Sequence, residues 1–170
     1  MSAWFDAYGC DPVREGLVVG AVPRDADDVA VLRSLGVTRV VCLVADEEYG
    51  SGDRRAVEAA YDAAGIAEDR VPSEDFGRLP AATLEASSAL VADALAAGGT
   101  VYLHCRAGWQ RSVVTAAAVV GRTTGEAPAE ALAVVRSARR DACPLPHQVE
   151  DLEAWWAGRS GPGRATDRPV

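Results

Sequence analysis

What this sequence has little of already narrows the class of protein. No apolar run approaches the roughly 20 residues of a membrane-spanning helix, and residues 1–6 lack the basic and then apolar pattern of a secretory signal. Basic charge is in deficit, because the net charge is -8 at pH 7. This balance disfavours nucleic acid or an anionic membrane as the main partner. We therefore expect a cytoplasmic protein with no membrane insertion and no nucleic-acid partner.

Cysteine is also sparse, and its four copies are far apart: Cys10, Cys42, Cys105 and Cys143. They show none of the paired spacings that are typical of zinc sites, so we expect no metal and no cofactor. A disulfide framework is not expected in a chain of this size without a secretory signal. Cys42 lies in an apolar run and is expected in the core. A disulfide between Cys42 and Cys105 under oxidation is the less favoured alternative.

The chain has 170 residues and 49% hydrophobic composition, enough for one domain with a sizeable core. Apolar patterning predicts strands at 17–22, 39–44, 66–71 and 99–103. It predicts helices at 25–35, 53–64, 81–97, 112–124, 129–140 and 147–157. Strands alternating with helices favour an α/β fold, with a central mostly parallel sheet flanked by helices on both faces.

The two ends of the chain are expected to add little to this fold. Residues 1–16 are interpreted as a polar lead-in that Trp4 and Phe5 hold against the body. Residues 1–157 are expected to form a single domain. Residues 158–170 are rich in glycine and proline and predict a flexible tail. We expect a monomer.

The most informative segment is residues 104–112, His-Cys-Arg-Ala-Gly-Trp-Gln-Arg-Ser, between a predicted strand and a predicted helix. A loop of this kind can turn several backbone N–H groups inward, and Gly108 permits the unusual backbone angles that this requires. The helix dipole adds positive potential. Arg111 can bind two phosphoryl oxygens at once. The segment therefore predicts a phosphate-binding loop.

A thiol in such a field is expected to be a thiolate at neutral pH, which makes Cys105 a nucleophile that needs no general base. Ser112 is expected to donate its hydroxyl to the sulfur, and His104 to brace the loop by hydrogen bonds. The phosphate would be enclosed by the loop residues Arg106, Ala107, Gly108, Trp109, Gln110 and Arg111. The competing interpretation is that Cys105 is a small buried hydrophobic residue.

His-Cys-x5-Arg-Ser resembles the signature of the cysteine-dependent protein phosphatases, and the compact chain is similar to their dual-specificity branch. The resemblance extends to residues 16–20, 37–41 and 134–139. It implies a general acid about thirty residues before the cysteine, and Asp75 stands thirty residues before Cys105. Glu74 is the main rival for this role, and Asp69 is a more distant one.

The resemblance also implies roles for residues outside the loop. Gln148 is similar to a glutamine that positions the attacking water in some members, although many members carry Pro-Asn in this region and this chain does not. An alternative is that Gln148 simply opens the last helix. Trp109 is expected at the pocket rim. Arg139 is expected to compensate the dipole of its helix, and it also aligns with a pocket-facing position in some relatives.

The sequence thus predicts hydrolysis of a phosphorylated protein or a small phosphoester through a phosphocysteine, with phosphotyrosine favoured over phosphoserine and phosphothreonine. A phosphoinositide or inositol phosphate substrate is disfavoured by the absence of lysine from the loop, although Arg106 keeps it open. A rhodanese-type sulfurtransferase usually has a loop one residue shorter. A non-catalytic phosphate-binding module and an RNA 5'-phosphatase are the remaining alternatives.

Overall fold

A twisted sheet forms the centre of the molecule. The computed structural model describes residues 1–49 and 53–160, and in these residues the sheet has five strands in the order β1-β2-β5-β3-β4. The strands are β1 (Cys10–Arg14), β2 (Leu17–Gly20), β3 (Arg39–Cys42), β4 (Ala67–Arg70) and β5 (Val101–His104). β2, β5, β3 and β4 are parallel, and β1 runs antiparallel to β2. The predicted mostly parallel sheet is confirmed.

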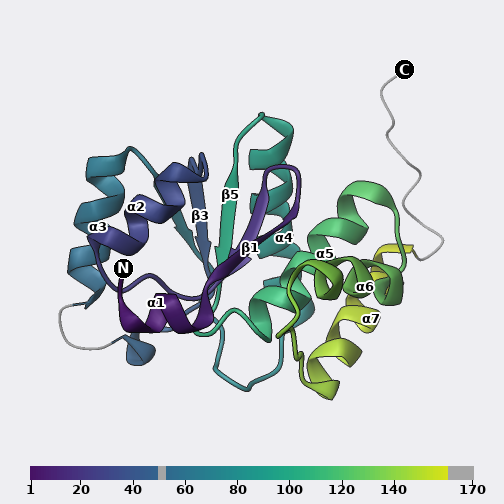
Figure 1. Cartoon of the computed structure of the whole chain (residues 1–170). Coiled ribbons are helices and arrows are strands. Elements are labelled where there is room, and N and C mark those ends of the chain that lie inside the picture. Colours follow the sequence, from purple (N-terminus) through teal and green to yellow (C-terminus); the bar gives the residue numbers. More distant parts are fainter. Residues whose placement is uncertain (50–52, 161–170) are drawn as a thin grey trace.

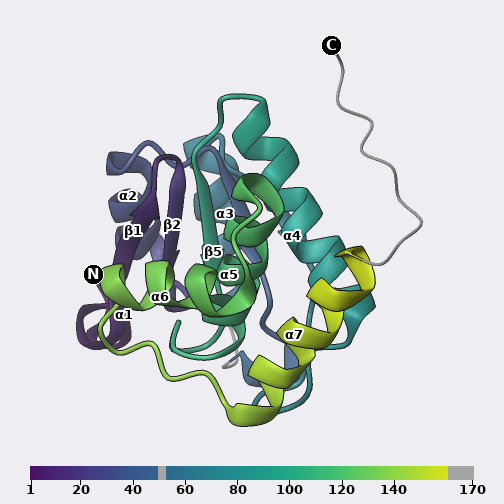
Figure 2. The same cartoon turned by 90° about the vertical axis from the view of Figure 1, so that its right-hand side faces the viewer.

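Helices cover both faces of this sheet (Figures 1 and 2). On one side lie α1 (Ala3–Tyr8), α2 (Ala26–Ser34) and α3 (Asp53–Ala64), and the short 3-10 helix η1 (Asp46–Glu48) follows β3. On the other side lie α4 (Ala81–Ala96), α5 (Arg111–Thr124), α6 (Pro128–Ala138) and α7 (Pro146–Ser160). Among the described residues, no helix is both long and apolar enough to cross a membrane.

The interior has two hydrophobic cores, one on each face of the sheet, because successive side chains of a strand point to opposite faces. Val19 and Leu103 pack against α4, α5 and α7. Val18 and Tyr102 pack on the opposite face, with side chains of α1, α2 and α3. The central helix α5 is buried along residues 111–121, which are mainly small or β-branched. Its burial fixes the position at which α5 begins, and the candidate site lies there.

The prediction for residues 1–16 is wrong in its main point, because this segment is regular structure. The Ser2 hydroxyl accepts a hydrogen bond from the Phe5 amide and caps α1. Phe5 is buried, as expected from a segment held against the body. β1 contains Pro12, which pairing rules tolerate because β1 is an edge strand. Its weak apolar pattern explains why sequence periodicity missed it.

The predicted start of the flexible tail is also wrong. α7 continues to Ser160, and Arg159 within it forms an ion pair at 2.7 Å with Glu85 of α4. Residues 161–170, the rest of the predicted tail, lie outside the described residues. Gly36 and Gly65 follow α2 and α3 with positive φ of 77° and 67°, as expected of glycines that end helices.

Candidate active site

The segment predicted to bind phosphate forms a tight turn between β5 and α5. Cys105 follows the last residue of β5, and Arg111 is the first residue of α5. Gly108 has φ of +74°, and a Cβ atom there would collide with the backbone of Gly20 at the end of β2. Only glycine satisfies both conditions. The Val22 amide donates to the Arg106 carbonyl at 3.0 Å, so the chain that follows β2 also holds the loop.

Cys105 lies at the base of this loop, and the residue is 3% exposed. Burial by itself raises the pKa of the Cys105 thiol. The Arg111 guanidinium, the Ser112 hydroxyl and the backbone amides of Ser112 and Gln110 outweigh burial and lower that pKa below its ordinary value. The Ser112 Oγ lies 3.3 Å from the sulfur. The surroundings of Cys105 therefore shift the pKa of its thiol in the direction that the sequence analysis expected.

Arg111 is a fully buried guanidinium whose donors are aimed by the protein. Its Nη1 and Nη2 donate to the two carboxylate oxygens of Glu48, each at 2.7 Å. Nη1 also donates to the Ser73 carbonyl at 2.7 Å, and Nη2 lies 2.8 Å from Asp75 Oδ1. These contacts fix the plane of the guanidinium beside the Cys105 sulfur.

Glu48 is a functional residue that the sequence analysis missed. It is the last residue of η1, which begins four residues after the end of β3. Burial raises the pKa of Glu48, but hydrogen bonds from Arg111 and the Ala45 amide outweigh burial and lower it. A signal was present, because residues 46–48 are all acidic and lie at the carboxyl end of β3, the neighbour of β5. Side chains in that position converge on the ligand site of an α/β sheet.

Asp75 is the carboxylate that the structure brings to the thiol pocket. It lines the same pocket as Cys105, and its Oδ2 lies 4.0 Å from Arg106 Nη1. Glu74 does not line this pocket; it lies in a neighbouring hollow beside Glu47 and Glu48. The more distant rival, Asp69, is on β4 and is paired with Arg39 of β3. The geometry therefore favours Asp75 over both rivals.

The pocket above Cys105 has a volume of about 450 Å³ and a largely aromatic rim. It is lined by Trp4, Tyr8, Asp75, Phe76, Cys105, Arg106, Ala107, Trp109 and Gln110. The Tyr8 ring links the Trp4 and Trp109 rings, with centroids 4.2 Å and 5.0 Å away. Trp109 is thus at the rim as predicted. The contribution of α1 was not foreseen, since residues 1–16 were interpreted as a lead-in.

His104 and Gln148 lie behind the pocket. The His104 Nδ1 is 3.2 Å from the Cys105 carbonyl oxygen, which agrees with the bracing contact expected of it. Gln148 is fully buried at the start of α7, and its Nε2 donates to the Gly77 carbonyl at 3.0 Å. Gln148 does not line the thiol pocket. Its contact with Gly77 braces the Asp75 loop, and its role in positioning water stays a prediction.

Arg139 lies at the C-terminal end of α6, the position from which it was expected to compensate the helix dipole. It does not line the pocket, which differs from the other expectation; it is 2% exposed and lies behind the loop. Its guanidinium donates to the Gly108 carbonyl at 2.5 Å, the Ala107 carbonyl at 3.0 Å and the Tyr8 carbonyl at 2.8 Å. By binding carbonyls that point away from the pocket, Arg139 supports a loop whose amides point inward.

Cys42 is fully buried, as predicted. It packs in the core on the α1–α3 side of the sheet, whereas Cys105 packs in the core on the α4–α7 side. A disulfide between the two thiols is disfavoured, because their side chains point to opposite faces of the sheet.

Comparison with known proteins identifies the fold. No family model matches the chain, and no curated protein matches its sequence. Among solved structures, PTPMT1 has a TM-score of 0.75 and 22% sequence identity, over 88% of this chain and 94% of that chain. Tk-PTP in the active form has a TM-score of 0.75 and 23% identity, over 86% of this chain and 95% of that chain. Human DUSP28 has a TM-score of 0.69 and 28% identity, over 89% of this chain and 95% of that chain. The chain has the fold of the cysteine-dependent dual-specificity phosphatases.

Proposed function

We propose that this chain is a phosphatase that hydrolyses phosphate monoesters through a phosphocysteine, with aryl phosphates such as phosphotyrosine as its preferred substrates. The observation that carries the proposal is the position of Cys105. Its thiol, whose pKa is lowered, lines the same pocket as Asp75. The Ser112 hydroxyl contacts the sulfur, and the buried Arg111 guanidinium contacts Asp75. Nucleophile, phosphate ligand and proton donor are thereby brought together.

The first step forms a bond between sulfur and phosphorus. The Cys105 thiolate attacks phosphorus while the bond to the leaving oxygen breaks, and Asp75 gives that oxygen a proton. Arg111 and the loop amides hold the transferring phosphoryl oxygens. In the structure Asp75 contacts Arg111 at 2.8 Å. Phosphoryl oxygens that bind Arg111 would compete with this ion pair and free the carboxyl for the leaving group.

The second step breaks the bond between sulfur and phosphorus. Water attacks the phosphocysteine and passes its proton to Asp75, which restores the acid. The sulfur leaves as a thiolate, and the Ser112 hydroxyl, 3.3 Å away, stabilises its charge. No cofactor enters either step, because the leaving group, the nucleophile and the proton donor are all supplied by the substrate, the protein and water.

The aromatic rim supports an aryl substrate. Trp4, Tyr8 and Trp109 form a continuous wall beside Cys105, and stacking against such rings stabilises an aromatic group by about 0.5–1.5 kcal/mol. An aliphatic phosphoester gains less from this wall. Substitution Trp4→Leu should therefore raise KM for an aryl phosphate by roughly threefold to tenfold. It should change KM for a small alkyl phosphate much less.

A phosphoinositide is the second candidate substrate. Arg106 lies on the pocket wall with its guanidinium 5.7 Å from the Trp4 ring centroid and could bind a second phosphate. A solved structure of PTPMT1 is a complex with PI(5)P. For this chain the choice between protein and lipid substrates is decided by a panel of phosphotyrosine and phosphoserine peptides and PI(5)P vesicles. The cytoplasmic location and the monomeric state stay predictions.

The central test is activity toward a generic aryl phosphate. Cys105→Ser should abolish it, and Asp75→Asn should lower kcat by about a hundredfold and remove the fall in rate at high pH. Glu74→Gln is the matched control and should retain activity. Sulfur transfer from thiosulfate without phosphatase activity would instead identify a sulfurtransferase. Loss of the high-pH fall in Glu74→Gln alone would reassign the acid.

A further inference from the structure

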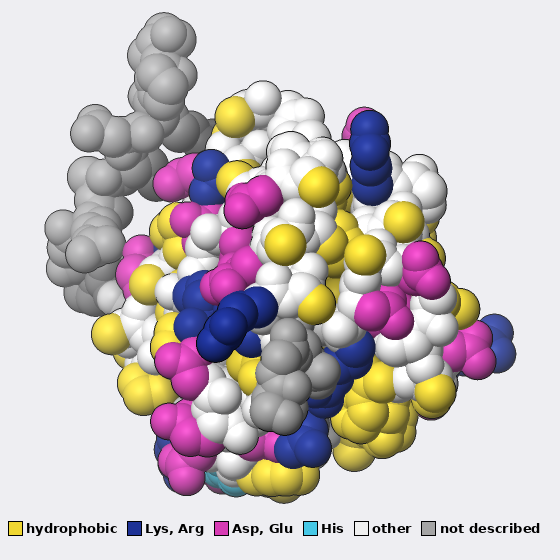
Figure 3. All heavy atoms as spheres, turned by 90° about the vertical axis from the view of Figure 1, so that its left-hand side faces the viewer, with side chains coloured by type: hydrophobic (Ala, Val, Ile, Leu, Met, Phe, Trp, Pro, Cys, Tyr) yellow, Lys and Arg dark blue, Asp and Glu magenta, His cyan; other side chains and the backbone are white. Residues whose placement is uncertain are grey.

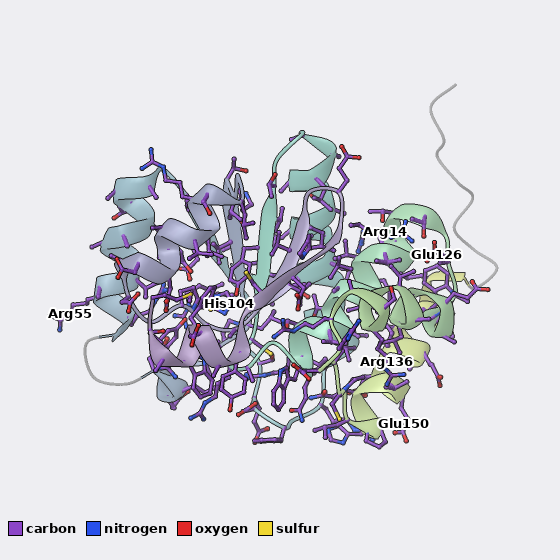
Figure 4. The ribbon with its side chains drawn as sticks, in the orientation of Figure 1. Arg14, Arg55, His104, Glu126, Arg136 and Glu150 are labelled. Atoms are coloured by element: carbon purple, nitrogen blue, oxygen red, sulfur yellow. The ribbon has the colours of Figure 1, made fainter. Side chains whose placement is uncertain are left out.

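Three side chains that can ligate metals meet behind the phosphate loop, on the opposite face of the sheet from the Cys105 sulfur. Cys42 ends β3, Glu68 lies in β4 and His104 ends β5. These strands are neighbours in the sheet. The Cys42 sulfur, a Glu68 carboxylate oxygen and a His104 ring nitrogen all lie within 4.8 Å of one another. His104, labelled in Figure 4, points into the interior of the fold.

The imidazole of His104 presents one buried nitrogen to the Cys42 thiol. Its Nδ1 lies 3.2 Å from the Cys105 carbonyl, which can only accept a hydrogen bond, so Nδ1 carries the proton. Nε2 then presents a lone pair toward Cys42, with which His104 interacts, and it has no well-formed hydrogen bond to any other described group. A lone pair held this way beside a thiol and a carboxylate is available to a metal ion. Histidines that bind metals commonly donate their other ring N–H to a backbone carbonyl, as His104 does.

The surroundings offer further polar groups and a route from solvent. Tyr49 Oη lies 3.2 Å from the Cys42 sulfur, and the buried Tyr61 hydroxyl has no hydrogen-bond partner. A surface hollow of about 370 Å³ is lined by Tyr61 and Glu68, with Glu58, Asp62, Ile66 and Ala67. Figure 3 views the molecule from the side of α2 and α3, where arginine and acidic side chains are intermingled. A cation could therefore approach Glu68 from this side.

We propose that Cys42, Glu68 and His104 form a transition-metal site whose ligand set best suits Zn²⁺. Sulfur, nitrogen and carboxylate oxygen are the donors that zinc binds, whereas magnesium and calcium prefer oxygen alone. The thiolate and the carboxylate together balance the charge of the ion. The sequence analysis expected no metal because the cysteines are not paired. These ligands come one from each of three strands, which no linear spacing reveals.

Arg54 is the competitor of the metal for Glu68. Its Nη1 and Nη2 donate to the two Glu68 oxygens at 2.8 Å and 2.5 Å. Arg54 also forms an ion pair at 2.8 Å with Glu58, one turn along α3. Metal binding would take one oxygen of Glu68 and leave the other to Arg54. Arg54→Met should therefore strengthen metal binding, whereas Glu68→Gln should weaken it.

The experiment uses the full chain with Cys42 as its only thiol, through Cys10→Ser, Cys105→Ser and Cys143→Ser. The Cys105 substitution removes the active-site thiolate as a competing ligand. Titration with Co²⁺ should give one equivalent of bound ion with a thiolate-to-cobalt charge-transfer absorption, and Zn²⁺ should displace it. Zn²⁺ should also raise the Tm. The variant that additionally carries Cys42→Ser is the matched control and should lose the absorption.

Glu68→Gln in the same background keeps the thiol and tests the site without removing Cys42. Because loss even of an indirect partner costs about 10–100-fold in metal affinity, loss of this ligand should weaken Zn²⁺ binding by at least about tenfold. The proposal is overturned if the single-thiol protein shows no charge-transfer absorption with Co²⁺. Unchanged Zn²⁺ affinity in Glu68→Gln would overturn it equally.

Discussion

The carboxylate of Glu48 accepts hydrogen bonds from both terminal nitrogens of the Arg111 guanidinium, each at 2.7 Å. These residues are 63 positions apart in the chain. Arg111 is fully buried, so its charge has lost the water that would solvate it and needs a charged partner in the protein. Glu48 compensates that charge and fixes the guanidinium plane, while Nη2 also contacts Asp75, which lines the pocket that contains Cys105.

Glu48→Gln should therefore impair phosphate binding. The amide of glutamine would direct one N–H toward an N–H of Arg111, and a hydrogen bond to a charged group contributes about 1.5–3 kcal/mol. We expect kcat/KM for an aryl phosphate to fall roughly tenfold or more. The neighbouring exposed Glu47→Gln is the control. Equal kinetics in the two variants would show that Glu48 does not position Arg111.

The Ser112 hydroxyl should control the charge of the Cys105 sulfur. It lies 3.3 Å from that sulfur and contributes to lowering the thiol pKa. In Ser112→Ala that pKa should rise, so alkylation of Cys105 near pH 6 should slow relative to alkylation at high pH. The phosphocysteine should also break down more slowly and give a burst of the first product. Ser137→Ala on α6 is the control, and a pH profile of alkylation unchanged from wild type would count against this role.

Arg139 should organise the loop without touching the substrate. It donates to the carbonyls of Ala107 and Gly108, which lie on the outer side of the loop. Arg139→Lys keeps the charge but cannot reach both carbonyls and Tyr8 together. We expect weaker inhibition by inorganic phosphate and a kcat/KM lowered by about tenfold or more. Arg136→Lys, exposed on α6, is the control, and Tm measurements separate loop effects from unfolding.

Local patterns in the sequence were sufficient for the architecture and for the loop. The continuous apolar runs predicted β3 and β5, and the glycine stops predicted the ends of α2 and α3. The residues of the loop 104–112 are contiguous in the chain. Their spacing alone was therefore enough to predict that Cys105, Arg111 and Ser112 act at one site. Asp75 came from the resemblance, which implies a general acid about thirty residues before Cys105.

What the sequence could not provide depends on contacts between distant segments. Glu48 meets Arg111 only after β3 and β5 pair, and Arg139 reaches the loop only after α6 folds back over it. The α1 wall of the pocket escaped detection because six residues are too few for a helical period to be recognised. Edge strand β1 has too mixed a pattern to be recognised. These residues are visible only in three dimensions.

Glu85 of α4 links α4 to α5 and α7, and the stability that these contacts add should depend on pH. It accepts hydrogen bonds from Trp155 and Arg159 of α7 and pairs with Arg122 of α5. Burial raises the pKa of Glu85, but these partners outweigh burial and lower it from 4.5 to about 2. A lowered pKa means that the stabilisation is complete above about pH 4.5 and is lost as pH falls toward 2.

The matching measurement is thermal unfolding of Glu85→Gln and wild type. At pH 7 the variant should be less stable by about 1 kcal/mol or less, since the network is solvent-accessible. That corresponds to a Tm lower by about 2–4 °C. The difference should shrink as pH approaches 2. Glu153→Gln, exposed on α7, is the control, and a Tm difference that is the same at every pH would show that Glu85 acts through packing.

The contact between Gly108 and Gly20 has a consequence for how this protein could acquire new specificity. Any side chain at position 108 would push the loop away from the end of β2. Within the loop, selection for other phosphoesters is thereby confined to positions 106, 107, 109 and 110, whose residues line the pocket. Engineering libraries that randomise those four positions and leave both glycines in place should yield folded proteins, whereas libraries that include position 108 should be dominated by unfolded ones.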